Sequence, residues 1–105
     1  MESNTAVTAL AALAQDTRLS IFRMLVQRAP NPVNPGHLAE SLEIPKATLS
    51  FHLKELSIAG LISAESQGRQ KLYRANLETM NTLIDYLLEN CCQGDDCRTS
   101  GSRSC

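Results

Sequence analysis

Four cysteines lie within the last fifteen residues of the chain, and they are the residues best suited to chemistry. Cys91, Cys92 and Cys97 fall within seven positions, and Cys105 follows them. No cysteine occurs before position 91, so general composition does not explain the cluster. Soft thiolates select soft acceptors, and trivalent arsenic or antimony prefers three of them. The spacing therefore predicts a metalloid site made by Cys91, Cys92 and Cys97, with Cys105 as a possible further ligand.

The segment between the second and third cysteines allows such a site to form within one subunit. Gln93–Asp96 provides a short return toward Cys97, and Gly94 is free to adopt a positive φ. If Cys91 and Cys92 are still helical, their side chains diverge by about 100°. A methylated trivalent arsenical needs only two thiolates, so Cys97 with either neighbour would suffice for that ligand.

Other thiol chemistries remain open. Four cysteines could form a tetrahedral zinc site, although the usual Cys-x-x-Cys spacing is absent. A redox switch could pair Cys91 or Cys92 with Cys97, and the cysteines could also be incidental to a disordered tail. Cys92 through Arg98 satisfies the Cys-x5-Arg pattern of small phosphatases, but Asp95 and Asp96 would repel an anion there. We therefore predict a protein that is not an enzyme and has no organic cofactor.

Composition and charge narrow the class further. The 105 residues are 43% hydrophobic and 20% charged, which is typical of one soluble globular domain. No apolar run approaches the roughly 18 residues of a membrane span, and the N-terminus does not resemble a signal peptide, so we expect a cytoplasmic location. Residues 46–74 carry five bases against two acids, whereas residues 77–97 carry five acids and no base. The first segment could meet a polyanion and the second could receive a cation.

Local signals predict five helices and a hairpin. Residues 5–14 are Ala/Leu-rich, with apolar positions at Val7, Leu10, Ala11 and Ala14. Asp16-Thr17 is expected to cap a second helix whose apolar face comprises Leu19, Phe22, Met24, Leu25 and Val26. The proline-rich run 30–36 is a break. A short helix over 37–42, a turn at 43–45 and a helix over 46–59, ended by Gly60, outline a helix-turn-helix.

The second helix of this motif has two distinct faces. Leu49, Leu53 and Leu56 form the buried stripe. The opposite face supplies candidates for direct DNA contact, namely Lys46, Thr48, Ser50, Phe51 and Lys54. Phe51 either meets a thymine methyl group or packs on a neighbouring element, and we expect Ile58 to pack. His52 borders the stripe, and we expect it to be a hydrogen-bonded structural residue.

Residues 61–66 and 70–74 alternate like the strands of a hairpin around a turn at 67–69. Arg69 and Lys71 would place positive charge at its tip, where it could contact the DNA backbone. A last helix is expected from Leu77 to about Cys92. Its apolar stripe is too wide for a short chain to bury alone, so this helix and the first one would form a dimer surface. The domain boundaries expected are 1–92 for the folded domain and 93–105 for a flexible tail that completes the inducer site.

These residues resemble the arsenic-responsive (ArsR/SmtB-type) winged-helix repressors. The matching stretches are 14–22, 38–40, 44–56 and 59–62, followed by the Gly68-Arg69 hairpin and Tyr73-Arg74. The resemblance covers about residues 5–92, and its Ser-x-His-Leu-x-x-Leu-x-x-x-Gly-Leu core is fairly specific. It implies a mainly α winged helix-turn-helix (α-α-α-α-β-β-α). It also implies a homodimer that represses transcription at operator DNA until an inducing ion or thiol modification weakens its grip.

The resemblance also separates the possible inducer sites. The family's founding arsenic sensors carry Cys-x-Cys at the start of the motif's first helix, where this chain has Asn34–His37. Its zinc sensors use histidine with carboxylates on the last helix, where this chain has Asp85 and Glu89 but no histidine. The remaining pattern is similar to a third variant, with a vicinal Cys-Cys after the last helix and another cysteine further on. That variant implies As(III) as the inducer, with Sb(III) or methylated trivalent arsenic also possible.

Overall fold

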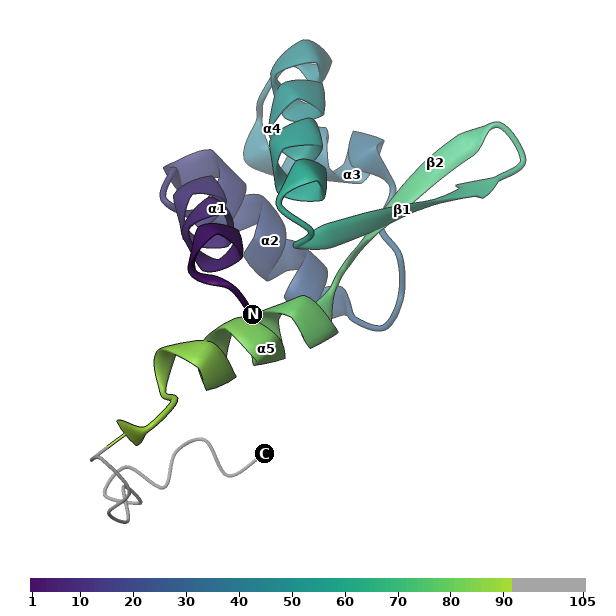
Figure 1. The fold of residues 1–105 in the computed structure, drawn as a ribbon. Helices are drawn as coiled ribbons and strands as arrows, with labels where there is room; N and C mark the ends of the chain where they lie inside the picture. The colour runs from purple at the N-terminus through teal and green to yellow at the C-terminus, as the bar shows by residue number, and fades with distance from the viewer. Residues whose placement is uncertain (92–105) are drawn as a thin grey trace.

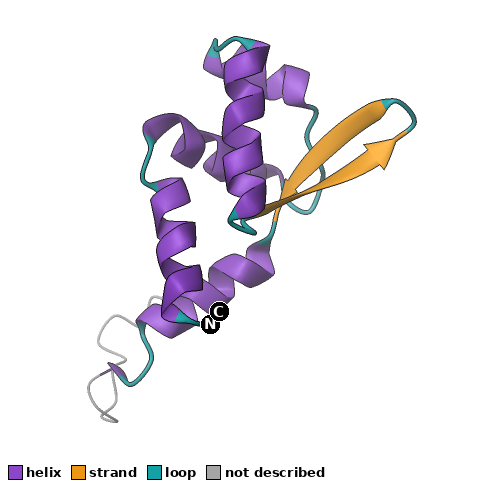
Figure 2. Cartoon of the chain, turned by 45° about the horizontal axis from the view of Figure 1, so that its top comes forward, coloured by secondary structure: helices purple, strands orange, loops and turns teal. Residues whose placement is uncertain are grey.

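The computed structural model describes residues 1–91 of the chain. Its helices and strands follow in the order α1 (Ser3–Leu13), α2 (Asp16–Arg28), α3 (Pro35–Leu42), α4 (Lys46–Ile58), β1 (Ile62–Gln67), β2 (Gln70–Ala75) and α5 (Leu77–Leu87). This order confirms the predicted winged helix-turn-helix. The helices gather on one side, and the hairpin projects from them beside α4 (Figures 1 and 2). None of the helices within residues 1–91 has the length and apolar character needed to cross a membrane.

The core draws on nearly every element. Its fully buried large side chains are Ile21, Leu25, Leu38, Leu49, Leu56, Leu61 and Leu83. They come from α2, α3, α4, the start of the hairpin and α5. Truncating such a side chain to alanine typically lowers the free energy of unfolding by about 2–5 kcal/mol, because a cavity remains. The buried leucine stripe of α4 therefore fixes which face of that helix points outward.

Three local features shape the helix-turn-helix. The Asn34 side chain accepts a hydrogen bond from the Gly36 N–H at 2.6 Å, so α3 begins at Pro35, two residues before the predicted start. Glu43 ends α3 in the left-handed conformation at φ 54°. Gly60 follows α4 at φ 77°, which confirms the predicted role of this glycine after the helix.

The hairpin has continuous antiparallel pairing from Ile62↔Ala75 to Gln67↔Gln70. Its loop is therefore only two residues, and Gly68 at φ 64° supplies the positive φ that a loop this tight needs. On its other edge β2 is tied to the segment before α3, because Val33 and Tyr73 exchange two backbone hydrogen bonds of 2.7 and 2.9 Å. The base of the hairpin is thus held from both sides.

One prediction about the first two helices was wrong. Gln15, and not Asp16-Thr17, caps α2: its backbone is extended and its side chain accepts from the Arg18 N–H at 2.9 Å. In α1 the buried positions are Ala6, Ala9 and Ala12, whereas Val7, Leu10, Ala11 and Ala14 are exposed. Small residues allow α1 to pack closely on its neighbours, so its larger apolar side chains face outward.

The expected inward face of α2 is correct only in part. Phe22 and Leu25 are buried as predicted, but Leu19 and Val26 are 43% and 38% exposed. Ile21, at 0% exposed, takes the inward position instead.

The last helix is shorter than predicted. It ends at Leu87, with Leu88 at its C-terminal cap, and Asn90 adopts the left-handed conformation at φ 58°. The Glu89 N–H donates to the Tyr86 carbonyl, and the Cys91 N–H donates to the Leu88 carbonyl. These tight turns replace the helical pattern, so Cys91 does not lie on a continuation of α5. The side-chain divergence of about 100°, which assumed such a continuation, therefore does not apply.

Candidate functional site

The predicted DNA-reading side of α4 is open to solvent. All five residues predicted to contact DNA directly are exposed: Lys46, Thr48, Ser50, Phe51 and Lys54. The opposite stripe of Leu49, Leu53 and Leu56 is at most 3% exposed. Within residues 1–91 no ion pair engages either lysine. This surface therefore presents two ammonium groups, two hydroxyls and one aromatic ring that can meet another molecule.

Phe51 and Ile58 are the large apolar residues exposed on α4. Phe51 is 56% exposed and makes only an edge-on contact with the His52 ring, at 5.4 Å between ring centroids. Of the two predicted readings, this favours an outward role for Phe51. Ile58 is 67% exposed, so the expected packing of this side chain is not found within the single chain.

His52 is a structural residue, as predicted. It is 8% exposed, and its Nδ1 lies 3.2 Å from a terminal nitrogen of Arg18. A guanidinium can only donate, so Nδ1 is assigned as the acceptor and the ring proton belongs on Nε2. Burial lowers the pKa of His52, the positive charge of Arg18 lowers it further, and Glu55 opposes both effects. His52 is thereby kept neutral at physiological pH.

Arg18 joins three helices, a role that the sequence analysis did not assign. Its Nε donates to the carbonyl of Ala12 near the end of α1 at 2.7 Å, while its other arm reaches His52 on α4. Its backbone N–H is the group capped by Gln15. One side chain at the start of α2 thus connects the first helix to the helix predicted to read DNA.

The hairpin carries the basic residues predicted for it, but they differ in availability. Arg69 and Lys71 are exposed, and neither has an ion-pair partner within the described part of the chain. Arg74 instead forms an ion pair with Glu65 and donates to the Pro30 carbonyl at 3.1 Å. A hydrogen bond from Gln67 lowers the pKa of Glu65, and Arg74 adds to that effect. Arg74 therefore braces the base of the hairpin.

Helices α1 and α5 also expose apolar side chains. The exposed large apolar residues of α1 and of α5 with its C-terminal cap are Val7, Leu10, Leu77, Leu87 and Leu88. Each is between 42% and 60% exposed. These helices contact each other within the chain. They are the pair that the sequence analysis predicted as a dimer surface.

Of the predicted metalloid ligands, the structure places only Cys91. It is exposed and disulfide-bonded, and its N–H bonds to the Leu88 carbonyl at 2.9 Å. Cys92, Cys97 and Cys105 lie outside the described residues. Among residues 1–91 no three His, Cys, Asp or Glu side chains are grouped so as to hold a metal ion. The inducer site therefore stays a prediction.

Comparison with known proteins identifies the family. A helix-turn-helix domain model matches residues 13–63. The chain is 38% identical over 92 residues to the arsenical resistance operon repressor of Bacillus subtilis (strain 168), which covers 82% of this chain and 84% of that protein. The protein belongs to the ArsR/SmtB family of winged-helix transcriptional regulators. It is thus a transcriptional repressor of the ArsR/SmtB type and not an enzyme.

Solved structures of related proteins share this ArsR/SmtB fold. Reduced HlyU from Vibrio cholerae N16961 is 30% identical with a TM-score of 0.65, covering 87% of this chain and 93% of that one. The winged helix-turn-helix domain of Mb0332 from Mycobacterium bovis, described as homodimeric, is 20% identical with a TM-score of 0.67. That match covers 88% of this chain and 85% of the other, and at this identity it supports the fold alone.

Proposed function

We propose that this ArsR/SmtB repressor binds operator DNA as a homodimer and releases it when trivalent arsenic or antimony binds Cys91, Cys92 and Cys97. The observation that carries the proposal is its 38% identity to an arsenical resistance operon repressor. Its cysteines support the same conclusion, since all of them follow α5. Thiolates are the ligands that soft trivalent metalloids select. The protein would act in the cytoplasm, where such thiols stay reduced.

The DNA-binding half of the proposal rests on α4 and the hairpin. Two copies of α4 would enter successive major grooves about 34 Å apart and read a pseudo-palindrome. Lys46, Thr48, Ser50, Phe51 and Lys54 would make the direct contacts. Arg69 and Lys71 at the exposed hairpin would bind backbone phosphates and so position α4 on the duplex.

The dimer would form through α1 and α5. Their exposed leucine and valine side chains are apolar surface that a second copy would remove from water. Lys46 and Lys54 lie on α4 and not on α1 or α5, so such an interface would leave them open to DNA. Mb0332, which has the same fold, is described as homodimeric, and this supports the proposed dimer.

Release would follow from a change at the end of α5. Metalloid binding there would re-angle α5 against α1, and α1 is linked to α4 through Arg18 and His52. A 100-fold loss of DNA affinity requires only about 2.7 kcal/mol of coupling. By reciprocity, bound DNA must weaken metalloid binding by the same factor.

The test is an arsenite titration of the reduced protein that follows sulfur–metalloid ultraviolet absorbance and release from its own promoter DNA. Cys91→Ser, Cys92→Ser and Cys97→Ser should each abolish the absorbance and the release while leaving DNA affinity in the absence of arsenite unchanged. Cys105→Ser is the matched control and should behave as wild type. Full release by arsenite in any of the first three variants would remove that cysteine from the site.

A thiol redox switch is the second candidate function, because the same clustered cysteines could form a disulfide on oxidation. Adjacent cysteines form a strained ring, so Cys97 is the preferred partner of either Cys91 or Cys92 on geometric grounds. Such a repressor would be indifferent to arsenite and would leave DNA on treatment with peroxide. The same four variants distinguish the two functions when both reagents are used.

A further inference from the structure

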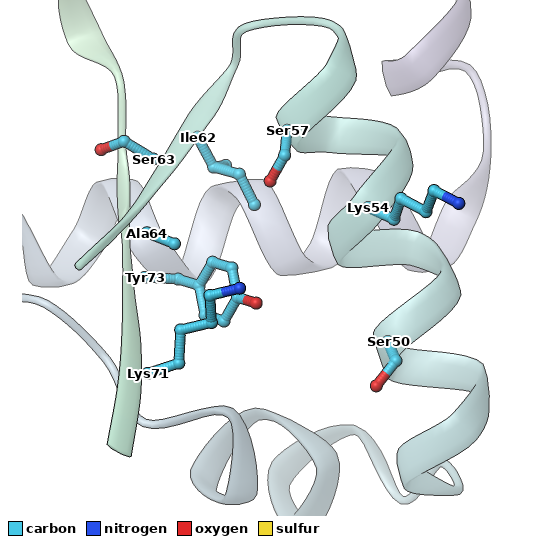
Figure 3. A pocket seen from close by; sticks show the side chains of 8 residues that line it. All are labelled: Ser50, Lys54, Ser57, Ile62, Ser63, Ala64, Lys71 and Tyr73. Atoms are coloured by element: carbon cyan, nitrogen blue, oxygen red, sulfur yellow. The ribbon is translucent and has the colours of Figure 1, made fainter. Parts of the chain in front are cut away.

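A cleft of about 370 Å³ lies between α4 and the hairpin. Its lining comes from both elements: Ser50, Lys54 and Ser57 of α4, and Ile62, Ser63, Ala64, Lys71 and Tyr73 of the hairpin. Figure 3 shows the Ser57 hydroxyl, the Tyr73 hydroxyl and the Lys71 amine on the sides of this gap, while the Lys54 side chain extends away from the hairpin.

The chemistry of the lining suits an oxyanion. Ser50, Ser57 and Tyr73 provide three hydroxyl groups and Lys71 provides an ammonium group, and no carboxylate lines the cleft. The Ser63 hydroxyl points away from α4, because successive side chains of a strand face opposite sides (Figure 3). Glu65, the nearest acid along β1, is engaged by Gln67 and Arg74. Hydroxyl and ammonium donors that converge from two sides match a group with several acceptor oxygens and a negative charge, such as a phosphate.

Tyr73 is the most firmly held of these donors. Its residue pairs with Ala64 of β1 on one side, and on the other it exchanges two backbone hydrogen bonds with Val33. Its ring is half-buried, so the phenol is a pre-positioned donor. A donor that is already fixed loses little side-chain entropy when a ligand arrives.

The position of the cleft identifies the source of the phosphate. If α4 occupies a major groove and the hairpin lies toward the adjacent minor groove, the strand that separates those grooves must pass between them. The cleft lies at that point. Contacts to the backbone of this DNA strand would be independent of base sequence, and they would fix the depth and angle of α4 in the major groove.

We propose that this cleft binds one phosphodiester of that DNA strand, with Ser57 and Tyr73 as donors and Lys71 as the main charge. The inference rests on the proposed DNA-binding function and deepens it. It assigns a DNA contact to Ser57 and Tyr73, which were not among the predicted contacts, and it gives Lys71 a defined phosphate.

The first test compares two conservative tyrosine variants. Tyr73→Phe keeps the ring but removes the donor, and it should weaken binding to promoter DNA and to an unrelated duplex by a similar factor, about tenfold. Tyr86→Phe removes a hydroxyl from a half-buried tyrosine on α5 and should change neither affinity. Thermal melting checks that both variants are folded. Unchanged affinities in Tyr73→Phe would overturn the proposal.

The second test locates the phosphate. Promoter duplexes each carrying one neutral methylphosphonate should show one position per half-site where wild type loses affinity but Tyr73→Phe loses little more. Equal losses in both proteins at every position would also overturn the cleft proposal, even if DNA binding itself is strong. Failure of wild type to bind any duplex would instead refute the proposed function, so the two failures are distinguishable.

Discussion

Helices α4 and α5 are similar in length but bury their apolar residues very differently. In α4, three leucines of one stripe are at most 3% exposed, and the outward side is mostly polar. In α5 only Leu83 is buried, while Leu77, Leu87 and the capping Leu88 remain 43% to 54% exposed. The folded subunit therefore buries a full leucine stripe of α4, although Phe51 and Ile58 stay exposed, whereas it buries one residue of α5. The difference indicates that α4 is positioned from within the subunit, and it supports the proposed dimer interface on α5.

A charge on α5 gives the strongest test of this contrast. Leu87→Lys would place an ammonium group in the proposed interface, where burying an unpaired charge is costly. We expect dissociation to monomers in sedimentation, and a loss of promoter affinity of about 100-fold, equivalent to about 2.7 kcal/mol. Leu19→Lys on α2, also at a partly exposed leucine, should leave the dimer intact. A dimeric Leu87→Lys protein would contradict an interface that includes the end of α5.

Truncation on α4 should affect DNA recognition and not assembly. Phe51 is 56% exposed, so Phe51→Ala should change the free energy of unfolding by less than about 1 kcal/mol. If the ring meets a thymine methyl group, affinity for promoter DNA should fall about tenfold while affinity for an unrelated duplex stays the same. Competition binding with both duplexes measures this. An equal loss on both would assign Phe51 to the backbone and not to the bases.

The hairpin tip should contribute a smaller, sequence-independent term. Arg69→Gln should lower affinity for all duplexes and reduce the slope of log affinity against log salt by about one per subunit. Fluorescence anisotropy at several salt concentrations provides this slope. Arg23→Gln, which removes an exposed charge from α2, is the control. A slope unchanged by Arg69→Gln would remove the tip from the DNA interface.

The smallest effect concerns pH and the anchoring of α4. Burial and the charge of Arg18 lower the pKa of His52, so the unfolded chain binds its proton more readily than the folded one. Folding stability from this residue is therefore fully present above its ordinary pKa of about 6.5 and is lost as the pH falls below it. Urea unfolding at pH 7.5 and 5.5 in a His37→Gln background should show the loss. Adding His52→Gln should abolish that pH dependence, and its persistence would contradict the assignment.

The helix-turn-helix and hairpin were predictable because their signals are local. The periodic leucines of α4, the conformation of Gly60 and the two alternating strands each act within a few residues. The end of α5 was not predictable in the same way. The apolar pattern continues through Leu87, Leu88 and Cys91, but periodicity does not report where the backbone stops being helical. The helix ends at Leu87, and Asn90 then adopts the left-handed conformation.

The cleft and the Arg18 connection were beyond the sequence for another reason. Ser57, Ser63 and Tyr73 line one space only because of the angle between the hairpin and α4. That angle depends on contacts between distant residues, such as the pairing of Val33 with Tyr73. Arg18 and His52 likewise come together across 34 positions of the chain. No local spacing encodes such a meeting. The metalloid site is a local prediction, and it stays one because Cys92 and Cys97 lie outside the described residues.

The two backbone closures around the hairpin make residues 33–76 a candidate for transplantation between repressors. Val33 is bonded to Tyr73, and the Asn76 N–H bonds to the Leu61 carbonyl at 2.8 Å, so the segment that holds α3, α4 and the hairpin is tied to itself at both ends. A chimera that exchanged this segment with a relative, while keeping the surfaces that pack on Ile21 and Leu25, should carry over operator choice and retain the host's inducer. Sensor and promoter could then be combined independently.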